Sequence, residues 1–213
     1  SLKILAKELD VAEEDILDFE LSVFLMEEPM YIGIEDTLIS SPRLDNLTSC
    51  SALVSALIDG ERATGINLIE LADHEEVGSH TKQGAASILL HDMVKRIVKG
   101  LGGNDEDAER ALYGAMMVSA DVAHAMHPNK AGKMDITNKP VLGKGLCIKQ
   151  ACVQSYATDA ETTGIFCQIC DSKEIPYQRF VNRSDVRGGG TLGAISSTMT
   201  PVRTMDIGIP MLA

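Results

Sequence analysis

The chain has 213 residues, of which 45% are hydrophobic and 23% are charged, a composition typical of a folded globular protein rather than a disordered one. Its formal net charge of −12 argues against a general nucleic-acid binder, because such a protein needs a basic face to displace counterions. No apolar stretch is long enough to cross a bilayer, and the first residues do not resemble a signal segment. The five cysteines, an odd number, do not suggest a disulfide framework. We therefore expect a cytoplasmic setting, with no nucleic-acid or membrane partner.

In the first part of the chain, apolar residues at helical spacing predict helices and short apolar runs predict strands. The predicted elements are a helix over 1–17, a strand over 19–26, a loop over 40–42, a helix over 47–58 and a strand over 66–72.

The second part continues the alternation of helices and strands. Helices are predicted over 84–98, 105–112 and 160–171, with another opened by residues 188–193. Strands are predicted over 115–120, 151–157, 175–181 and 204–209, and the segment 127–145 is irregular. This alternation is typical of an α/β fold built on a layered sheet.

The adjacent carboxylates Glu75 and Glu76 come directly after the predicted strand over 66–72. In open α/β sheets, ligands bind beyond the carboxyl ends of the strands. Two neighbouring carboxylates repel each other unless a positive charge separates them. A divalent metal would do so, with one carboxylate as ligand and the other as the base that takes a proton from water. The alternative is a solvated acidic turn.

Two further acids occur in comparable places. Asp45 stands at the entrance to the helix over 47–58, and Asp121 follows the strand over 115–120. Separately, Asp45 could be an N-cap and Asp121 could cap a turn. Together with Glu75 and Glu76 they supply three oxygen ligands and a general base, which is the requirement of a two-metal hydrolytic site.

Histidine is the usual companion of carboxylates on zinc. His91 is expected on a helix surface, and His74 should alternate away from Glu75. His124 and His127 follow Asp121, and their sequence position leaves two roles open, as ligands or as loop residues beside the site.

Two other motifs are less well supported by the residues around them. Residues 188–193 match the dinucleotide fingerprint, with Asp206 as the ribose acid, but the polar segment 182–186 stands where the fingerprint needs its strand. A glycine turn that opens a helix is also a seat for anions. Cys167 and Cys170 have the spacing of a zinc or redox pair, yet no second pair accompanies them, so core packing is favoured.

Five segments occur in an order that resembles the aspartyl aminopeptidase family, family M18 of the dizinc exopeptidases. They are 41–49 (SPRLDNLTS), 73–79 (DHEEVGS), 118–125 (VSADVAHA), 183–193 (RSDVRGGGTLG) and 206–213 (DIGIPMLA). The resemblance implies a three-layer α/β/α fold with a mixed, mostly parallel sheet, as in zinc exopeptidases, present here as a partial domain. It also implies that residues 1–29 are the end of an inserted dimerisation domain and residues 30–213 part of the catalytic domain.

The same resemblance implies roles for the acids. Asp45 would bridge two divalent metals, Glu76 and Asp121 would each hold one, and Glu75 would be the general base. Zinc is the default metal, although oxygen-rich ligand sets also suit manganese or cobalt. The family has two further histidine ligands, one upstream and one directly after the segment 210–213, which we expect to lie outside this chain.

The resemblance further implies that Lys149 and Tyr156 face the substrate, although Lys149 could instead be a solvated lysine at a strand end. The expected function is metal-dependent removal of N-terminal residues, acidic ones in particular, from peptides by a homo-oligomer, with this chain inactive by itself. The alternatives are a catalytically incomplete assembly or binding module, and a different dinuclear hydrolase, such as a deacylase, on the same fold.

Overall fold

The computed structural model describes residues 2–212. Contacts between Cα atoms divide the chain into two compact units, one that ends at Pro42 and one that begins at Arg43. The assignment of residues 1–29 to an inserted dimerisation domain stays a prediction. No helix in the described part of the chain is long and apolar enough to span a membrane.

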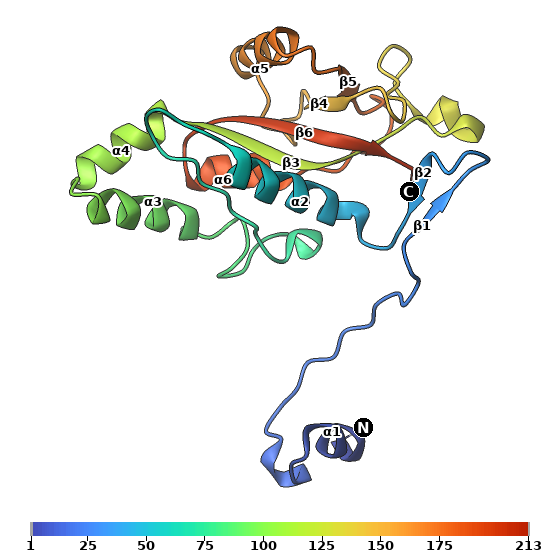
Figure 1. The fold of residues 1–213 in the computed structure, drawn as a ribbon, viewed down its shortest axis with the longest axis vertical. Coiled ribbons are helices and arrows are strands. Elements are labelled where there is room, and N and C mark those ends of the chain that lie inside the picture. Colours follow the sequence, from blue (N-terminus) through green and yellow to red (C-terminus); the bar gives the residue numbers. More distant parts are fainter. Residues whose placement is uncertain (1, 213) are drawn as a thin grey trace. The chain divides into compact units, whose positions relative to one another are not determined.

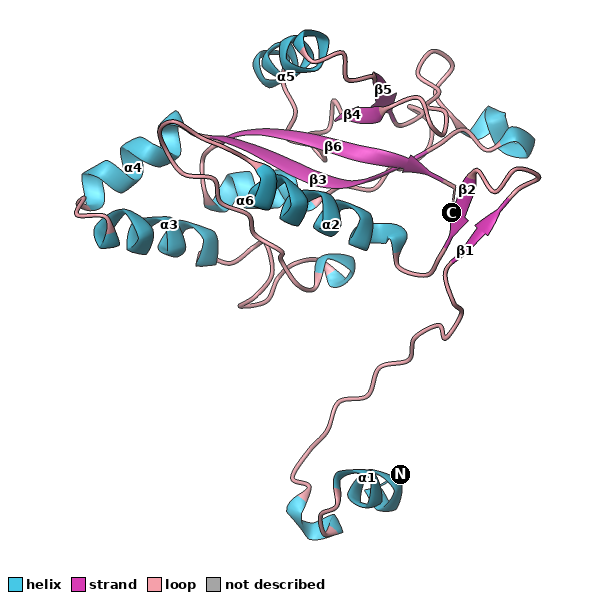
Figure 2. Cartoon of the chain, in the orientation of Figure 1, coloured by secondary structure: helices cyan, strands magenta, loops and turns pink. Residues whose placement is uncertain are grey.

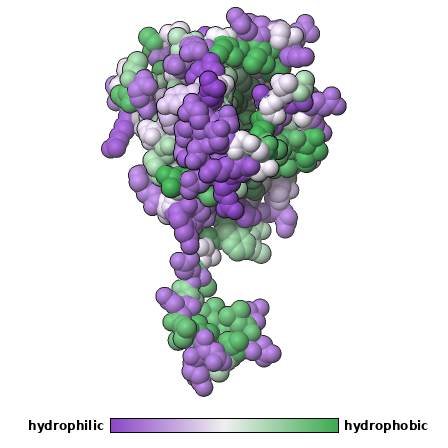
Figure 3. Space-filling view, turned by 90° about the vertical axis from the view of Figure 1, so that its left-hand side faces the viewer, coloured by the Kyte–Doolittle hydropathy of each residue, from purple (hydrophilic) through white to green (hydrophobic). Residues whose placement is uncertain are grey.

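The N-terminal unit contains little regular structure. Its elements are the helix α1 (Leu2–Leu9), the 3-10 turn η1 (Glu13–Asp15) and the antiparallel strands β1 (Met30–Ile32) and β2 (Leu38–Ser40). The helix predicted over 1–17 is therefore shorter, and the strand predicted over 19–26 is wrong. Leu17 and Val23 are almost fully exposed, and hydrophobic atoms lie on the surface of this unit in Figure 3. A strand needs a neighbour for its hydrogen bonds, and none of the described strands pairs with residues 19–26.

The C-terminal unit is built on a mixed four-stranded sheet. Its strands are β3 (Met116–His124), β4 (Leu146–Gln150), β5 (Tyr177–Val181) and β6 (Arg203–Met211). In the spatial order β3-β6-β4-β5, β3 is parallel to β6, β4 is parallel to β5, and β4 is antiparallel to β6. The predicted mixed, mostly parallel sheet of an α/β fold is confirmed.

Helices lie on both sides of this sheet (Figure 1). On one side α2 (Leu44–Asp59) and α6 (Leu192–Met199) contact β3 and β6, and on the other side lies α5 (Ala160–Ser172). The helices α3 (Leu89–Gly100) and α4 (Asp105–Gly114) pack against each other. Short 3-10 segments, η2 (Glu75–Val77) and η3 (Pro128–Lys133), follow in the loops after α2 and β3.

Two strand predictions in this unit are wrong. Residues 66–72 form no strand (Figure 2), and their side chains Ile66, Leu68 and Leu71 stay about half exposed. Residues 151–157 are turn and loop, because the strand there is β4, which ends at Gln150. The strand predicted over 115–120 is longer than expected, since all nine residues of β3 pair with β6.

Candidate metal centre

The start of α2 is attached directly to β3. The side-chain amide of Asn46 donates a 3.0 Å hydrogen bond to the carbonyl of Ala120, and the hydroxyl of Ser49 donates one of 3.0 Å to the carbonyl of Asp121. Asp45 itself has non-helical backbone angles, and its peptide bond to Asn46 is cis. Asp45 lies at a kink inside the first turn of α2, whose first residue is preceded by Arg43, so it does not stand at the N-cap of the helix as assigned.

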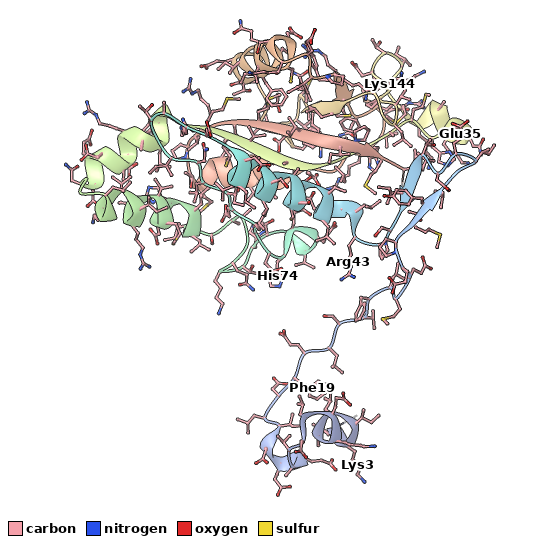
Figure 4. The ribbon with its side chains drawn as sticks, in the orientation of Figure 1. Lys3, Phe19, Glu35, Arg43, His74 and Lys144 are labelled. Atoms are coloured by element: carbon pink, nitrogen blue, oxygen red, sulfur yellow. The ribbon has the colours of Figure 1, made fainter. Side chains whose placement is uncertain are left out.

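Glu75 and Glu76 lie in η2, on a loop that is closed by hydrogen bonds. The amide of Asp73 donates to the carbonyl of Gln83 at 3.1 Å, and the amide of Ser79 donates to the carbonyl of His74 at 2.9 Å. Gly78 has a φ of 101°, which only glycine adopts without strain. Figure 4 labels His74 on this loop, where its Nδ1 lies 3.0 Å from the hydroxyl of Thr81. These bonds hold the two glutamates in a short turn.

Asp121 lies within β3 rather than at its end, because the strand continues to His124. The turn-capping interpretation of Asp121 is therefore wrong. Its Oδ2 accepts a 2.8 Å hydrogen bond from Nζ of Lys149, which also donates to the carbonyl of Val122 at 2.8 Å. Lys149 is only 3% exposed, so it is not the solvated strand-end lysine that the sequence left open.

The four acids converge, although they come from three separate segments. Asp45, Glu75, Glu76 and Asp121 all line one cavity of about 700 Å³, whose other walls are mainly apolar. Burial raises the pKa of Asp45, and the negative charges of Asp121 and Glu76 raise it further. Burial also raises the pKa of Glu75, with added repulsion from Asp121, Glu76 and Asp45. The cavity therefore holds more negative charge than its own cations balance.

This arrangement fits a divalent cation in charge and in the chemistry of its oxygen donors. The set of ligands is incomplete, because within residues 2–212 no three His, Cys, Asp or Glu side chains come close enough together to hold an ion. His127 does not offer its Nδ1 as a ligand, because this atom accepts a hydrogen bond from the amide of Asn129 and caps η3. The described residues thus offer carboxylate oxygens to a divalent cation but not a complete set of ligands.

A second, smaller cavity of about 180 Å³ adjoins the acids, and Asp45 and Asp121 line both cavities. Lys149, Tyr156 and His124 line the smaller one, together with the glycines at 189–190. The Lys149 ammonium lies 4.8 Å from the centre of the Tyr156 ring. The structure thus brings both residues assigned to the substrate together beside the acids.

The dinucleotide interpretation of residues 188–193 is wrong. A ribose-binding acid must face its ligand, but Asp206 is fully buried in β6. Its carboxylate accepts hydrogen bonds from the amide of Ala157 and from the hydroxyl of Thr191. A Cβ on Gly193 would lie 2.3 Å from this carboxylate, so the glycine is needed for close packing. In α5, Cys170 is buried and Cys167 half-buried, both as free thiols, which agrees with core packing.

Sequence reasoning missed the residues that position these acids. Asn46 and Ser49 carry no signal of their own, because a short polar residue near a helix start has many ordinary roles. Their partners on β3 lie 74 and 72 residues further along the chain.

Comparison with known proteins identifies the family of the chain. The family model of the aminopeptidase I zinc metalloproteases (M18) matches residues 1–213. The chain belongs to the M18 family. The family resemblance seen in the five segments is thereby confirmed. Its members are aminopeptidases, that is, metallo-exopeptidases, and zinc is the metal of the family.

The chain is similar to M18 proteins of several bacteria. It is 47% identical over 212 residues to a probable M18 family aminopeptidase 2 of Clostridium novyi, covering 100% of this chain and 49% of that protein. It is 40% identical over 210 residues to a protein of the same description from Pseudomonas aeruginosa, covering 98% of this chain and 48% of that protein. The chain thus spans about half the length of these curated relatives.

Solved structures agree with this placement. A structure of the Ape4 and Nbr1 complex matches with a TM-score of 0.87 and 32% identity, covering 99% of this chain and 42% of that chain. The mApe1 dodecamer of S. cerevisiae matches with a TM-score of 0.81 and 26% identity, covering 100% of this chain and 48% of that chain.

Proposed function

We propose that residues 1–213 form part of a metal-dependent aminopeptidase that removes acidic N-terminal residues from peptides. The observation that carries the proposal is the cavity into which Asp45, Glu75, Glu76 and Asp121 converge, in a chain of the M18 family. Family members are metallo-exopeptidases, and these four carboxylates are the residues that the family resemblance assigns to the metals and the base.

In this proposal Asp45, Glu76 and Asp121 would hold two divalent metals, most simply zinc, with Asp45 as the shared ligand and Glu76 and Asp121 as ligands of one metal each. When bound, such metals would supply Lewis-acid polarisation of the scissile carbonyl and would lower the pKa of a bound water. Glu75 takes the proton from the attacking water and passes it to the nitrogen of the leaving amine. Burial raises the pKa of Glu75, which favours a group that must first accept a proton and later donate it.

The smaller cavity would hold the side chain of the first substrate residue. The ammonium group of Lys149 lines this cavity and is buried. It therefore acts in a medium of low dielectric constant, where attraction to a carboxylate is strong. The ring of Tyr156 stands beside that ammonium. In the chain without metal this ammonium pairs with Asp121. If Asp121 is engaged by a metal, as proposed, an aspartyl or glutamyl side chain would supply the complementary charge.

The M18 structure from S. cerevisiae is a dodecamer by its description, and we extend self-association to this protein as part of the proposal. The apolar side chains exposed on the N-terminal unit support it, because a large apolar surface favours burial against a partner.

The test uses the full-length protein with zinc and a panel of chromogenic amides. Aspartyl and glutamyl amides with a free amine should be cleaved, leucyl and lysyl amides much less, and N-acetylaspartyl amide not at all. Release of acetate from N-acetylated amino acids, without cleavage of free-amine substrates, would assign the protein to the deacylases instead. Failure with every substrate, despite bound metal, would favour an assembly or binding module.

A further inference from the structure

We propose that Asp206 is a positioning residue, which fixes both walls of the smaller cavity beside the acids. This inference rests on the proposed function, because it concerns the cavity that we assign to the first substrate residue. Asp206 is fully buried at the middle of β6, opposite Ser119 of β3.

The carboxylate of Asp206 connects two segments that are far apart in the sequence. Its Oδ2 accepts a 2.6 Å hydrogen bond from the amide of Ala157, the residue after Tyr156. Its Oδ1 accepts from the hydroxyl of Thr191, the residue after the glycines at 189–190. Tyr156 and these glycines line the cavity from two separate segments, so a single side chain holds both.

Main-chain atoms of the same residue strengthen the connection. The hydroxyl of Thr158 accepts a 2.8 Å hydrogen bond from the amide of Asp206. Of the three residues after Ser155, Tyr156 therefore lines the cavity, and the next two are hydrogen-bonded to Asp206. The two walls also meet directly, because the amide of Thr191 donates to the carbonyl of Ser155 at 3.3 Å.

The chemistry of the Asp206 side chain indicates a role beyond packing in the core. A carboxyl group is costly to bury without hydrogen bonds, and a hydrophobic residue would fill the space at lower cost. None of the ion pairs within residues 2–212 includes Asp206. Its hydrogen bonds to Ala157 and Thr191 are therefore what offsets its burial.

The expected consequence is a change in substrate affinity rather than in the chemical step. If the walls loosen, Tyr156 and the glycine segment no longer confine the substrate side chain, and the ammonium of Lys149 loses its fixed neighbour. KM for an acidic substrate should rise while kcat changes little, and the preference for acidic over neutral substrates should fall.

The experiment compares variants of the full-length zinc-loaded protein. Asp206→Ala removes both hydrogen bonds, whereas Asp206→Asn keeps an oxygen for Ala157 and an amide for Thr191. Thr191→Val removes one bond at nearly constant volume and serves if Asp206→Ala does not fold. The matched control is Thr204→Val. Thr204 lies on β6 with Asp206 and is 4% exposed, against 3% for Thr191. Its hydroxyl donates to the carbonyl of Val202 and not to Asp206.

Two readouts are measured, namely KM and kcat for aspartyl and leucyl amides, and hydrogen exchange of the amides at 155–158 and 188–191. Thr191→Val should raise KM for the aspartyl substrate by about fivefold, the equivalent of one lost hydrogen bond. Exchange should accelerate at 188–191 in Thr191→Val and in both segments in Asp206→Ala, with Asp206→Asn close to wild type.

The proposal is overturned if Thr191→Val matches Thr204→Val in KM and in exchange, or if Asp206→Ala accelerates exchange in only one segment. If the wild-type protein cleaves no amide, the proposed function has failed. The exchange data alone then decide whether Asp206 joins the two cavity walls.

Discussion

Nζ of Lys149 lies 2.8 Å from Oδ2 of Asp121, and the two side chains are 4% and 17% exposed. Lys149 comes from β4 and Asp121 from β3, so the pair joins two strands that are not neighbours in the sheet. Within a cluster of four carboxylates, this ammonium compensates part of the negative charge.

Replacing this lysine should therefore destabilise the metal-free protein. Lys149→Met leaves Asp121, whose side chain is only 17% exposed, without its partner, which costs about 3 kcal/mol of unfolding free energy. Urea unfolding, followed by circular dichroism without metal, measures the change. Lys144→Met is the matched control, because Lys144 is an exposed lysine in the turn before β4. Equal stability of the two variants would contradict the prediction.

Glu75→Gln tests the general base. In the full-length enzyme the variant should bind metal normally and lose about 10²–10⁴-fold in kcat, because an amide cannot accept the proton. Metal content by mass spectrometry and steady-state kinetics are measured on the same preparation. Glu106→Gln, a change at an exposed helix position, should leave both unchanged. Near-normal turnover of Glu75→Gln with full metal content would assign the proton to another group.

Zinc binding by the 213-residue chain itself should be weak, because its described residues bring no three ligating side chains together. Titration in competition with a chromogenic chelator measures the affinity. We expect Asp121→Asn to reduce even this weak binding, since it removes one of the converging carboxylates. Tight zinc binding that survives Asp121→Asn would place the metal elsewhere and require His124 or another residue as ligand.

The helix α5 offers a test of pH dependence away from the acids. Asp159 caps it, because its Oδ1 accepts from the amide and the hydroxyl of Thr162, each at 2.8 Å. The backbone and side-chain hydrogen bonds from Thr162 lower the pKa of Asp159 below its ordinary value of 3.8. The charged cap therefore stabilises the fold above that value, and this contribution is lost as the pH falls through the lowered pKa.

Asp159→Ala should cost about 1 kcal/mol of unfolding free energy at pH 7, the usual loss for a helix cap. The difference in unfolding free energy between this variant and wild type should become smaller when the pH falls below 3.8, the ordinary pKa of an aspartate carboxyl group. Asp159→Asn, which can still accept the amide hydrogen bond, should lose less at neutral pH. A difference that stays constant with pH would show that the charge of Asp159 does not contribute.

Self-association can be tested on the N-terminal unit. Leu21, Val23 and Leu25 are 72%, 101% and 62% exposed, so they offer apolar surface to a second copy. Light scattering should detect an oligomer at micromolar concentration, and the triple change of these residues to serine should reduce its mass. Ile136→Ser, at an exposed position of the other unit, is the control. A clean monomer for the unchanged chain would contradict the prediction.

Local sequence patterns identified the helices better than the strands. The helices predicted over 105–112 and 160–171 agree closely with α4 and α5, and both begin with a side-chain cap at Asn104 or Asp159. Helical hydrogen bonds join residues four apart, so the information is local. Strands over 19–26, 66–72 and 151–157 were wrong, because an apolar run becomes a strand only where a neighbour pairs with it.

By itself the sequence determined the α/β class from local patterns and the M18 family from the resemblance of five short segments, and it singled out the four acids whose roles stay a proposal. Only the tertiary structure decided that Lys149 is buried against Asp121, that Asn46 and Ser49 attach the start of α2 to β3, and that Asp206 lies inside the fold. The contacts of Lys149, Asn46 and Ser49 join residues from 28 to 74 positions apart. Such partners are chosen by strand order and register, which no local pattern in one sequence encodes.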